Sequence, residues 1–329
     1  MDIIPYLPND NILRISILTN GEENGLTTFL KKKVVHFELN KIPTARLNFI
    51  SSNPNISEET NLESDLLNVR DEIEIKVSWG DEGQTLFKGI IFKIEKNLDP
   101  DSGYETKIEC KDICIDLTSE QEFVDNENFE DRMNRFLQNV SISNTVDLET
   151  YGSAVITQTH NTTPWDYLLG YLDSLGKMTS VRNGEFSVSD ITKEDVEAKF
   201  VASYGVNIIE FQGKKEEADT ASRVVIQYWN PNTQSVEEQE SSVDSNSTQR
   251  TETISISQAS YSPEIVDRIS KASASRNKWS GYNGKVIVPG NQEVICGEYI
   301  KFENVNEEIN DRSVLITSEH HTIENGNWT

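Results

Sequence analysis

The chain is poor in the residues on which most metal and redox sites depend. Its 329 residues include only three cysteines, Cys110, Cys114 and Cys296, and four histidines. An odd number of cysteines at this density is unlike the framework of a secreted disulfide-rich domain, so we expect buried free thiols. Cys110 and Cys114 have a spacing that zinc sites use, but no second cysteine or histidine pair follows at ligand spacing. The sequence therefore indicates no zinc site.

Long hydrophobic runs are also missing. No run of about 18 apolar residues occurs, so we expect no transmembrane helix and no insertion of this chain into a membrane. The first ten residues, Met1 to Asp10, lack a basic start and a small-residue cleavage site. This composition argues against a secretory signal peptide and for synthesis in the cytoplasm.

Basic residues are scarce relative to acidic ones. There are 30 lysines and arginines against 55 aspartates and glutamates, which leaves a net charge of −25. Such a charge repels a phosphate backbone, so it argues against partners that are nucleic acids or anionic membranes. The single basic run, Lys31–Lys33, is interpreted as a solvated turn.

Motifs of enzymes and cofactor sites are absent as well. There is no Gly-x-Ser-x-Gly elbow, His-Glu-x-x-His helix, Walker loop or dinucleotide fingerprint. His320 and His321 are neighbours on a predicted strand, so they point to opposite faces and do not share a metal ion. His36 and His160 lie in unrelated segments. Carboxylates are too frequent to single out a catalytic pair, so we expect no catalytic, cofactor or metal site and no enzymatic activity.

The chain does contain sequence patterns typical of β-strands, in both its N-terminal and its C-terminal parts. Its length predicts two or three domains, and 36% apolar residues suit a protein with much exposed surface. Residues 14–117 are rich in β-formers, and several runs alternate apolar with polar residues at period two. The predicted strands there are 34–40, 45–50, 72–78, 85–95 and 104–110. Several short strands separated by turn residues favour a barrel or a sandwich, which we place in a first domain of residues 1–117.

A second domain, residues 118–195, has α+β character. An amphipathic helix is predicted over 127–140, followed by a strand, a helix and a hairpin. Thr163 is a candidate N-cap with Pro164 in the first helical position, Asp166 can return a hydrogen bond, and Gly176 ends the helix. One face of this helix is apolar and comprises Trp165, Leu168, Leu169, Leu172 and Leu175. We interpret Trp165 as an anchor of the domain's core.

The remaining residues, 196–329, return to β character and form the third predicted domain. Its expected strands are 206–211, 221–229, 251–256, 298–302 and 313–323. A polar stretch at about 230–250 is nearly free of apolar residues and predicts a flexible loop. Ser262 and Pro263 open a predicted helix that runs to about residue 279.

Four short motifs follow one another along these domains. They comprise Leu86, Phe87 and Gly89 in a predicted hairpin; Thr163, Pro164, Trp165, Asp166, Leu169 and Gly176 around the capped helix; Pro289, Gly290, Gly297 and Tyr299; and His321, Gly326 and Trp328 at the end. Together they resemble the motifs of the baseplate hub or VgrG-like spike-base family of contractile injection systems. That family includes phage tail hubs, the N-terminal region of type VI secretion VgrG proteins and extracellular contractile particles.

The resemblance implies two tube-like β-barrel domains that flank a small α+β domain. It further implies a homotrimer whose barrels form a pseudo-hexameric ring between an inner tube and a central spike, in contact with baseplate wedge proteins. In this role the motif residues maintain the fold and perform no chemistry. VgrG-like members continue into a further barrel and a β-helical spike, whereas this sequence stops at Thr329, so the spike is either a separate chain or a missing region. The sequence does not distinguish among a phage tail, a type VI secretion system and an extracellular particle.

Two other functions stay open. A monomeric β-rich binding module or adhesin would use exposed aromatic residues, of which Trp229, Trp279 and Tyr282 are candidates. A hydrolase with dispersed carboxylates is the third hypothesis, and no motif favours it.

Overall fold

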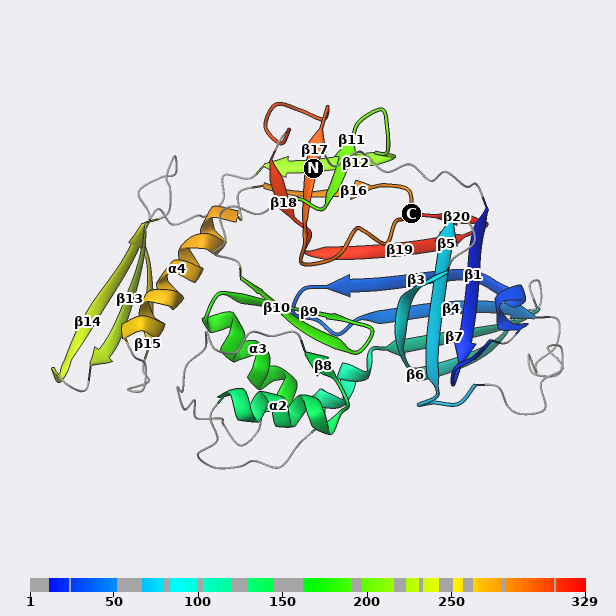
Figure 1. Ribbon diagram of the computed structural model, residues 1–329, viewed down its shortest axis with the longest axis horizontal. Coiled ribbons are helices and arrows are strands. Elements are labelled where there is room, and N and C mark those ends of the chain that lie inside the picture. Colours follow the sequence, from blue (N-terminus) through cyan, green and yellow to red (C-terminus); the bar gives the residue numbers. More distant parts are fainter. Residues whose placement is uncertain are drawn as a thin grey trace.

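The computed structural model describes residues 12–23, 25–51, 67–79, 83–99, 103–119, 129–144, 162–190, 197–215, 223–230, 233–242, 251–256, 263–279, 282–310 and 312–329. The protein is elongated and mainly β (Figure 1). A large antiparallel sheet lies at one end, a small α+β unit and a group of short strands lie in the middle, and a helix with three strands projects at the other end (Figure 1).

The large sheet contains nine strands in the order β2-β1-β5-β6-β7-β4-β3-β19-β20. Their bounds are β1 Leu13–Thr19, β2 Glu22–Glu23, β3 Leu30–Glu38, β4 Thr44–Ser51, β5 Glu72–Trp79, β6 Gln84–Asp99, β7 Gly103–Lys111, β19 Ser318–Glu324 and β20 Asn327–Trp328, with a 3-10 turn at Gly25–Phe29. Alternate residues of these strands point into one core, as the period-two pattern predicts. The last two strands come from the C-terminal end of the chain; β19 pairs with β3 and β20 pairs with β19, so both ends of the sequence build this sheet.

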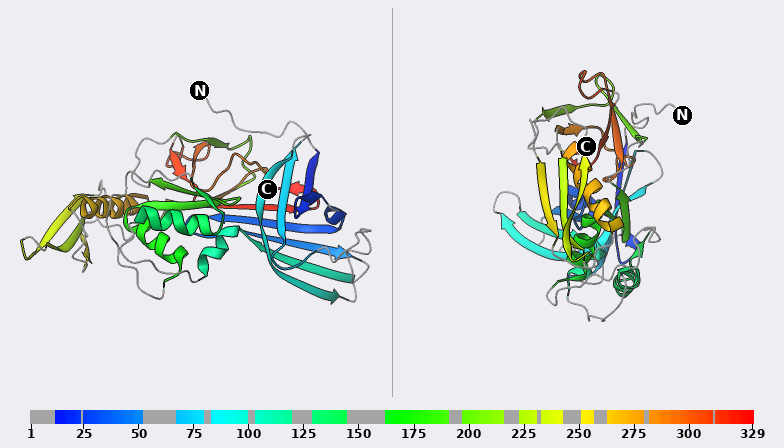
Figure 2. Two further views of the ribbon diagram at one scale, coloured as in Figure 1. Left: turned by 60° about the horizontal axis from the view of Figure 1, so that its bottom comes forward. Right: turned by 90° about the vertical axis from the view of Figure 1, so that its left-hand side faces the viewer.

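The sheet bends across its own core. Strand β6 pairs with both β5 and β7, and each ladder has a register shift within it. Such bulges increase strand bending, and β1 and β5 accordingly run across the direction of β3, β4 and β7 (Figures 1 and 2). In the described residues β2 and β20 end the sheet, and no sheet closes on itself. The two closed barrels expected from the resemblance are therefore not found in this part of the chain, because no ladder joins the outer strands.

One strand of this sheet corrects an expectation. The basic run Lys31–Lys33 was predicted as a solvated turn, but it lies within β3. Lys33 pairs in register with Leu47 of β4 and Ile323 of β19, so alternation turns its side chain toward the core, where it is fully buried. The position of this run in a central strand therefore decides that it is a strand with one buried lysine, although its charge favours exposure to solvent.

The α+β unit forms a second core beside the sheet. It consists of η2 Ile113–Thr118, α2 Phe129–Asn139, β8 Ser143–Asn144, α3 Pro164–Ser174, β9 Lys177–Arg182 and β10 Glu185–Asp190. Both helices agree with the amphipathic patterns of the sequence, and their apolar faces meet in a cluster that includes Phe129, Phe136, Leu168 and Leu172. The strand expected before α3 lies outside the described residues.

Backbone and side-chain amides hold the α+β unit against the sheet. Asn40, after β3, donates its backbone N–H to the Thr179 carbonyl at 2.8 Å and accepts the Thr179 N–H on Oδ1 at 2.8 Å. The Asp112 carboxylate accepts the backbone N–H of Gly184 at 2.9 Å, and Asn183 Oδ1 accepts that of Lys88 at 2.8 Å. The unit is therefore joined to the sheet along the β9–β10 hairpin.

A group of short strands follows in the sequence. They are β11 Phe200–Ser203, β12 Glu210–Lys215, β16 Tyr282–Ile287, β17 Tyr299–Glu303 and β18 Ser313–Leu315. Strand β17 pairs with β11 and β18, β12 pairs with β16, and the Phe211 and Phe302 rings connect the two ladders at 5.5 Å. The strand predicted over 206–211 begins only at Glu210, because the Asn207 side chain folds back onto the backbone of residues 201 and 203.

The projecting part, which we call the lobe, consists of β13 Arg223–Asn230, β14 Ser235–Ser242, β15 Thr251–Ile256 and α4 Pro263–Trp279 (Figures 1 and 2). Helix α4 covers one face of the three strands through Val266, Ile269 and Ala274. The flexible loop expected at about 230–250 is wrong for residues 235–242, which form β14. Its polar side chains pair across the ladder, for example Arg223 with Glu240, so the strand forms without a buried apolar row. Residues 243–250 lie outside the described part.

All three cysteines are free and buried, as expected from their number. Burial raises the pKa of each thiol, so these groups are protonated near neutral pH. Among the described residues, no helix has the length and apolar composition needed to cross a bilayer.

Candidate functional site

The predicted motif residues fall into separate places in the fold. Leu86 and Phe87 are buried on β6 in the core of the large sheet. Gly89 lies on the same strand, where a Cβ atom would stand 2.3 Å from the Lys111 carbonyl oxygen of β7. A glycine is required here because the two strands approach closely, so the first motif is a packing feature.

The second motif caps α3. Thr163 Oγ1 accepts the backbone N–H of Asp166 at 3.2 Å and donates its own proton to Asp166 Oδ2 at 2.7 Å. The hydrogen bond expected between the Asp166 side chain and the cap residue is thus made with the Thr163 hydroxyl. Trp165 is buried, with its ring 6.3 Å from that of Phe186, and Gly176 adopts a φ of 71° after the helix. Leu169 is half-buried beside the same core.

Residues of the third and fourth motifs meet at the C-terminal end. Gly290 donates its N–H to the Trp328 carbonyl at 2.8 Å, and a Cβ atom on Gly290 would stand 2.0 Å from the Trp328 ring. The Trp328 indole N–H donates to His321 Nδ1 at 3.1 Å. Trp79 of β5 donates its indole N–H to the Gly290 carbonyl at 2.9 Å and lies 6.2 Å from the Trp328 ring. We call Trp79, Gly290, His321 and Trp328 the tryptophan junction.

A buried ion pair extends the tryptophan junction toward the α+β unit. His321 Nε2 contacts Glu319, and the other carboxylate oxygen of Glu319 accepts from Arg182 of β9 at 2.5 Å and from the Cys296 N–H at 2.9 Å. Burial disfavours the charge of Glu319, but the hydrogen bond from His321 and the charge of Arg182 outweigh it and hold its pKa below the ordinary value. The Arg182 guanidinium also lies 4.0 Å from the centre of the Phe37 ring.

These contacts determine which ring nitrogen of His321 carries the proton. Because Nδ1 accepts the Trp328 N–H, the proton of His321 lies on Nε2 and points at Glu319. In the series of contacts from Arg182 to Trp79, each side chain thus has at least one hydrogen-bond partner. The arrangement presents no activated nucleophile; it joins β5, β9, β19 and the 289–297 segment into one rigid contact.

The other motif residues support this contact from nearby turns. Pro289 precedes Gly290, and Gly297 adopts a φ of 95° and donates its N–H to the Ile316 carbonyl at 2.8 Å. Gly326 adopts a φ of 76° in the turn between β19 and β20. Tyr299 is buried on β17.

Three participants, Trp79, Arg182 and Glu319, were missed at the level of sequence. They come from segments that the pattern places in different domains, so no local spacing joins them. One signal was available for Glu319, since it lies two residues before His321 and therefore faces the same side of the strand.

The fold is that of known tail proteins. A 43 kDa tail protein of prophage MuSo2 from Shewanella oneidensis matches with a TM-score of 0.73 at 12% identity, over 96% of each chain. A tail protein from Neisseria meningitidis MC58 matches with a TM-score of 0.70 at 12% identity, over 96% of this chain and 94% of that one. A component of the type VI secretion system of E. coli matches with a TM-score of 0.53 at 9% identity, over 95% and 74%. At these identities the likeness establishes the fold alone.

The sequence also matches a known protein family. It matches the Alg8 N-terminal domain over residues 9–325, so the chain belongs to the Alg8 N-terminal domain family. No curated protein matches the sequence.

Proposed function

We propose that this protein is the structural hub of a contractile injection baseplate. In this role it forms a homotrimeric, pseudo-hexameric ring, joins the inner tube to the central spike and contacts the baseplate wedge proteins. The observation that carries the proposal is the match to a prophage tail protein along 96% of both chains, together with the weaker match to a type VI secretion component. The four motifs of the sequence agree with this role.

The physical arrangement supports an assembly function. The tryptophan junction and the Arg182–Glu319 pair use buried polar residues to fix the relative positions of the sheet, the α+β unit and the C-terminal segment. Rigid placement of this kind suits a part that transmits force and sets geometry. Among the described residues, β2 ends the nine-stranded sheet and leaves a strand edge that a neighbouring subunit can cover, whereas the Trp328 carbonyl of β20 already accepts the Gly290 N–H. The assembled particle is then the proposed location of the protein, and the role needs no enzymatic step.

The test is the mass and symmetry of the purified full chain. We expect native mass spectrometry and light scattering at micromolar concentration to give three times the chain mass of 37.3 kDa, and electron microscopy to give a three-fold ring. A stable monomer, alone and also after mixing with tube and spike proteins, would contradict the proposal.

One observation favours a second candidate, a monomeric binding module or adhesin. Trp229 and Val236 are paired in register at the end of the lobe and are 43% and 62% exposed. The side chains of Trp279 and Tyr282, the other two aromatic candidates, lie outside the described part. Saturable glycan-array binding by a monomer, lost in Trp229→Ala, would support this second function and not the first.

A further inference from the structure

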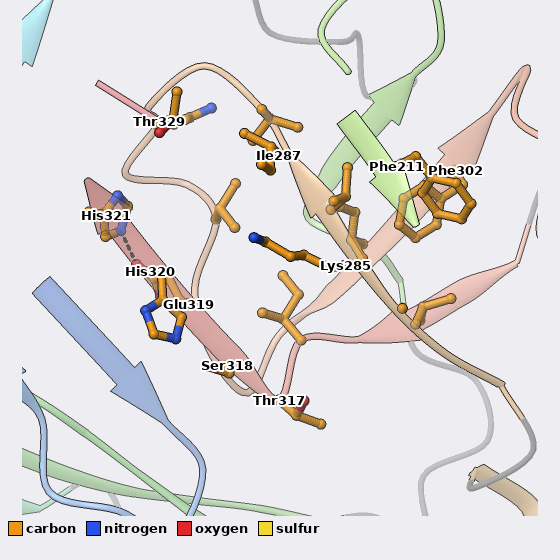
Figure 3. A pocket seen from close by; sticks show the side chains of 18 of the residues that line it. Phe211, Lys285, Ile287, Phe302, Thr317, Ser318, Glu319, His320, His321 and Thr329 are labelled. Carbon is orange, nitrogen blue, oxygen red and sulfur yellow. Dashed lines mark hydrogen bonds and ion pairs between the residues drawn. The ribbon is translucent and has the colours of Figure 1, made fainter. Parts of the chain in front are cut away.

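A cavity of about 580 Å³ lies beside the tryptophan junction. It opens between β16 and β19, and strands β17 and β18 contribute to its wall (Figure 3). Its apolar lining includes Val286, Val288, Val294, Phe302, Ile309 and Ile316. Sites for small organic ligands have about this volume and this mainly apolar character.

Most polar groups on the lining are already matched. Glu319 and His321 belong to the buried network described above. Ser318 Oγ lies 3.1 Å from His36 Nε2, and the backbone of Thr329 forms two hydrogen bonds with Thr322. These groups therefore offer little to a ligand.

Lys285 and Asn291 each contribute to the lining a donor that has no partner among the described residues. Lys285 of β16 extends into the cavity toward β19 (Figure 3), and its ammonium has neither an ion pair nor a hydrogen bond among the described residues. Asn291 is 6% exposed; its Oδ1 accepts the Glu293 N–H at 2.8 Å, whereas its buried Nδ2 has no acceptor in the part that the structure describes. An unmatched buried N–H destabilises a protein, and an acceptor from a ligand relieves that cost.

The charge of this lining is unusual for so acidic a chain. Burial lowers the pKa of His320, and the adjacent His36 and Lys285 lower it further, so His320 is neutral near pH 7. Lys285 is then the cation that a ligand meets, in a protein of net charge −25. The combination of one unmatched cation, an amide donor and an apolar wall selects for an anion with a hydrocarbon part.

We propose that this cavity is a binding site for an amphipathic carboxylate, whose anionic head pairs with Lys285 and whose hydrocarbon part lies on the apolar wall. Asn291 supplies a second donor for a ligand oxygen. The proposed binding site lies within one chain and is independent of the proposed hub function. It can therefore be tested on a monomer and on a trimer alike.

The experiment uses decanoate as the probe and isothermal titration calorimetry on the full chain. Decanol and decyltrimethylammonium serve as neutral and cationic counterparts, and acetate serves as the head group without a hydrocarbon part. We expect saturable binding of decanoate, weaker binding of decanol, and no binding of acetate or of the cationic probe.

Lys285 variants then test the charge directly. We expect Lys285→Gln to weaken decanoate binding at least threefold and Lys285→Glu at least tenfold, with Lys271→Glu on α4 in the lobe as a charge-matched control that leaves affinity unchanged. Lys285 is exposed at the surface of β16, so these variants are expected to keep the melting temperature. The proposal is overturned if decanoate does not bind, if decanoate, decanol and decyltrimethylammonium bind equally, or if Lys285→Glu binds decanoate as tightly as the unchanged chain does.

Discussion

Lys33 is the residue whose environment departs most from its ordinary chemistry. Its side chain is fully buried on the core face of β3, and its ammonium nitrogen has no hydrogen-bond partner among the described residues. The ionisable groups on the same face of the adjacent strand β19 are Glu319 and His321, which are engaged with each other and with Arg182. Desolvation lowers the pKa of Lys33 from 10.5 to about 7.

This shift makes stability depend on pH. Between about pH 7 and the ordinary pKa of 10.5, the unfolded chain holds a proton that the folded chain has lost, so the free energy of unfolding rises with pH in this window. Below about pH 7 the full penalty applies, which amounts to roughly 5 kcal/mol for a shift of this size. Removal of the charge should therefore stabilise the protein most at neutral and lower pH.

We predict that Lys33→Met raises the free energy of unfolding at pH 7 by at least about 2 kcal/mol and that this advantage shrinks by about 2 kcal/mol between pH 7 and pH 9. Chemical denaturation at both pH values measures the difference. Lys32→Met is the matched control, because Lys32 points to the opposite face, is 44% exposed and pairs with Glu324. An equal effect of both variants, or an advantage of Lys33→Met that does not change with pH, would show that burial of the Lys33 charge is not the cause.

At the scale of elements, α3 shows how far local signals reach. Its first turn contains Thr163 as cap, Pro164 in the first position and Asp166 in contact with the cap hydroxyl. Its apolar face contains the residues expected from the 3.6-residue period, and Tyr167 and Tyr171 extend that face beyond the expectation. The two tyrosines were not anticipated because their rings lie tilted against Phe129 of α2, which is a contact between elements.

We predict that Thr163→Ala destabilises the protein by about 1 kcal/mol, because the Asp166 N–H loses its acceptor at the helix start. Thr163→Ser keeps the hydroxyl and should retain most of the stability. Thermal unfolding followed by circular dichroism at 222 nm measures both variants. If the serine variant loses as much as the alanine variant, the hydroxyl is not the stabilising group.

At the scale of the whole molecule, one strand pairing and a small set of side-chain contacts join the N-terminal and C-terminal parts of the sequence. Strand β19 pairs with β3 along seven residues, and the tryptophan junction connects the same region to β5 and to the 289–297 segment. Arg182 brings in the α+β unit through Glu319. Loss of one of these contacts should therefore be felt across the molecule.

We predict that Gly290→Ala destabilises the protein by about 1–3 kcal/mol, because the added Cβ would overlap the Trp328 ring at 2.0 Å and the segment has to shift. Hydrogen exchange should become faster in β19 and β20 before it does in the lobe. Gly170→Ala on α3 is the control; apart from its chain neighbours and the helix's own backbone, no atom of the described residues lies within 4 Å of its added Cβ, and alanine favours the helix, so we expect unchanged or slightly higher stability. If hydrogen exchange in β19 and β20 also becomes faster in Gly170→Ala, overlap with Trp328 is not the cause.

The sequence by itself determined the elements whose signals are local. Period-two alternation located strands β3 to β7 of the large sheet, and the cap, proline and glycine signals located α3 and the start of α4, because such signals act between residues a few positions apart. Only the tertiary structure decided that Lys33 is buried, that residues 235–242 form a strand, that no described sheet closes, and that Glu319 meets Arg182. Each of these outcomes depends on pairing between segments distant in the sequence, where register and burial outweigh the local preference of a polar or charged run.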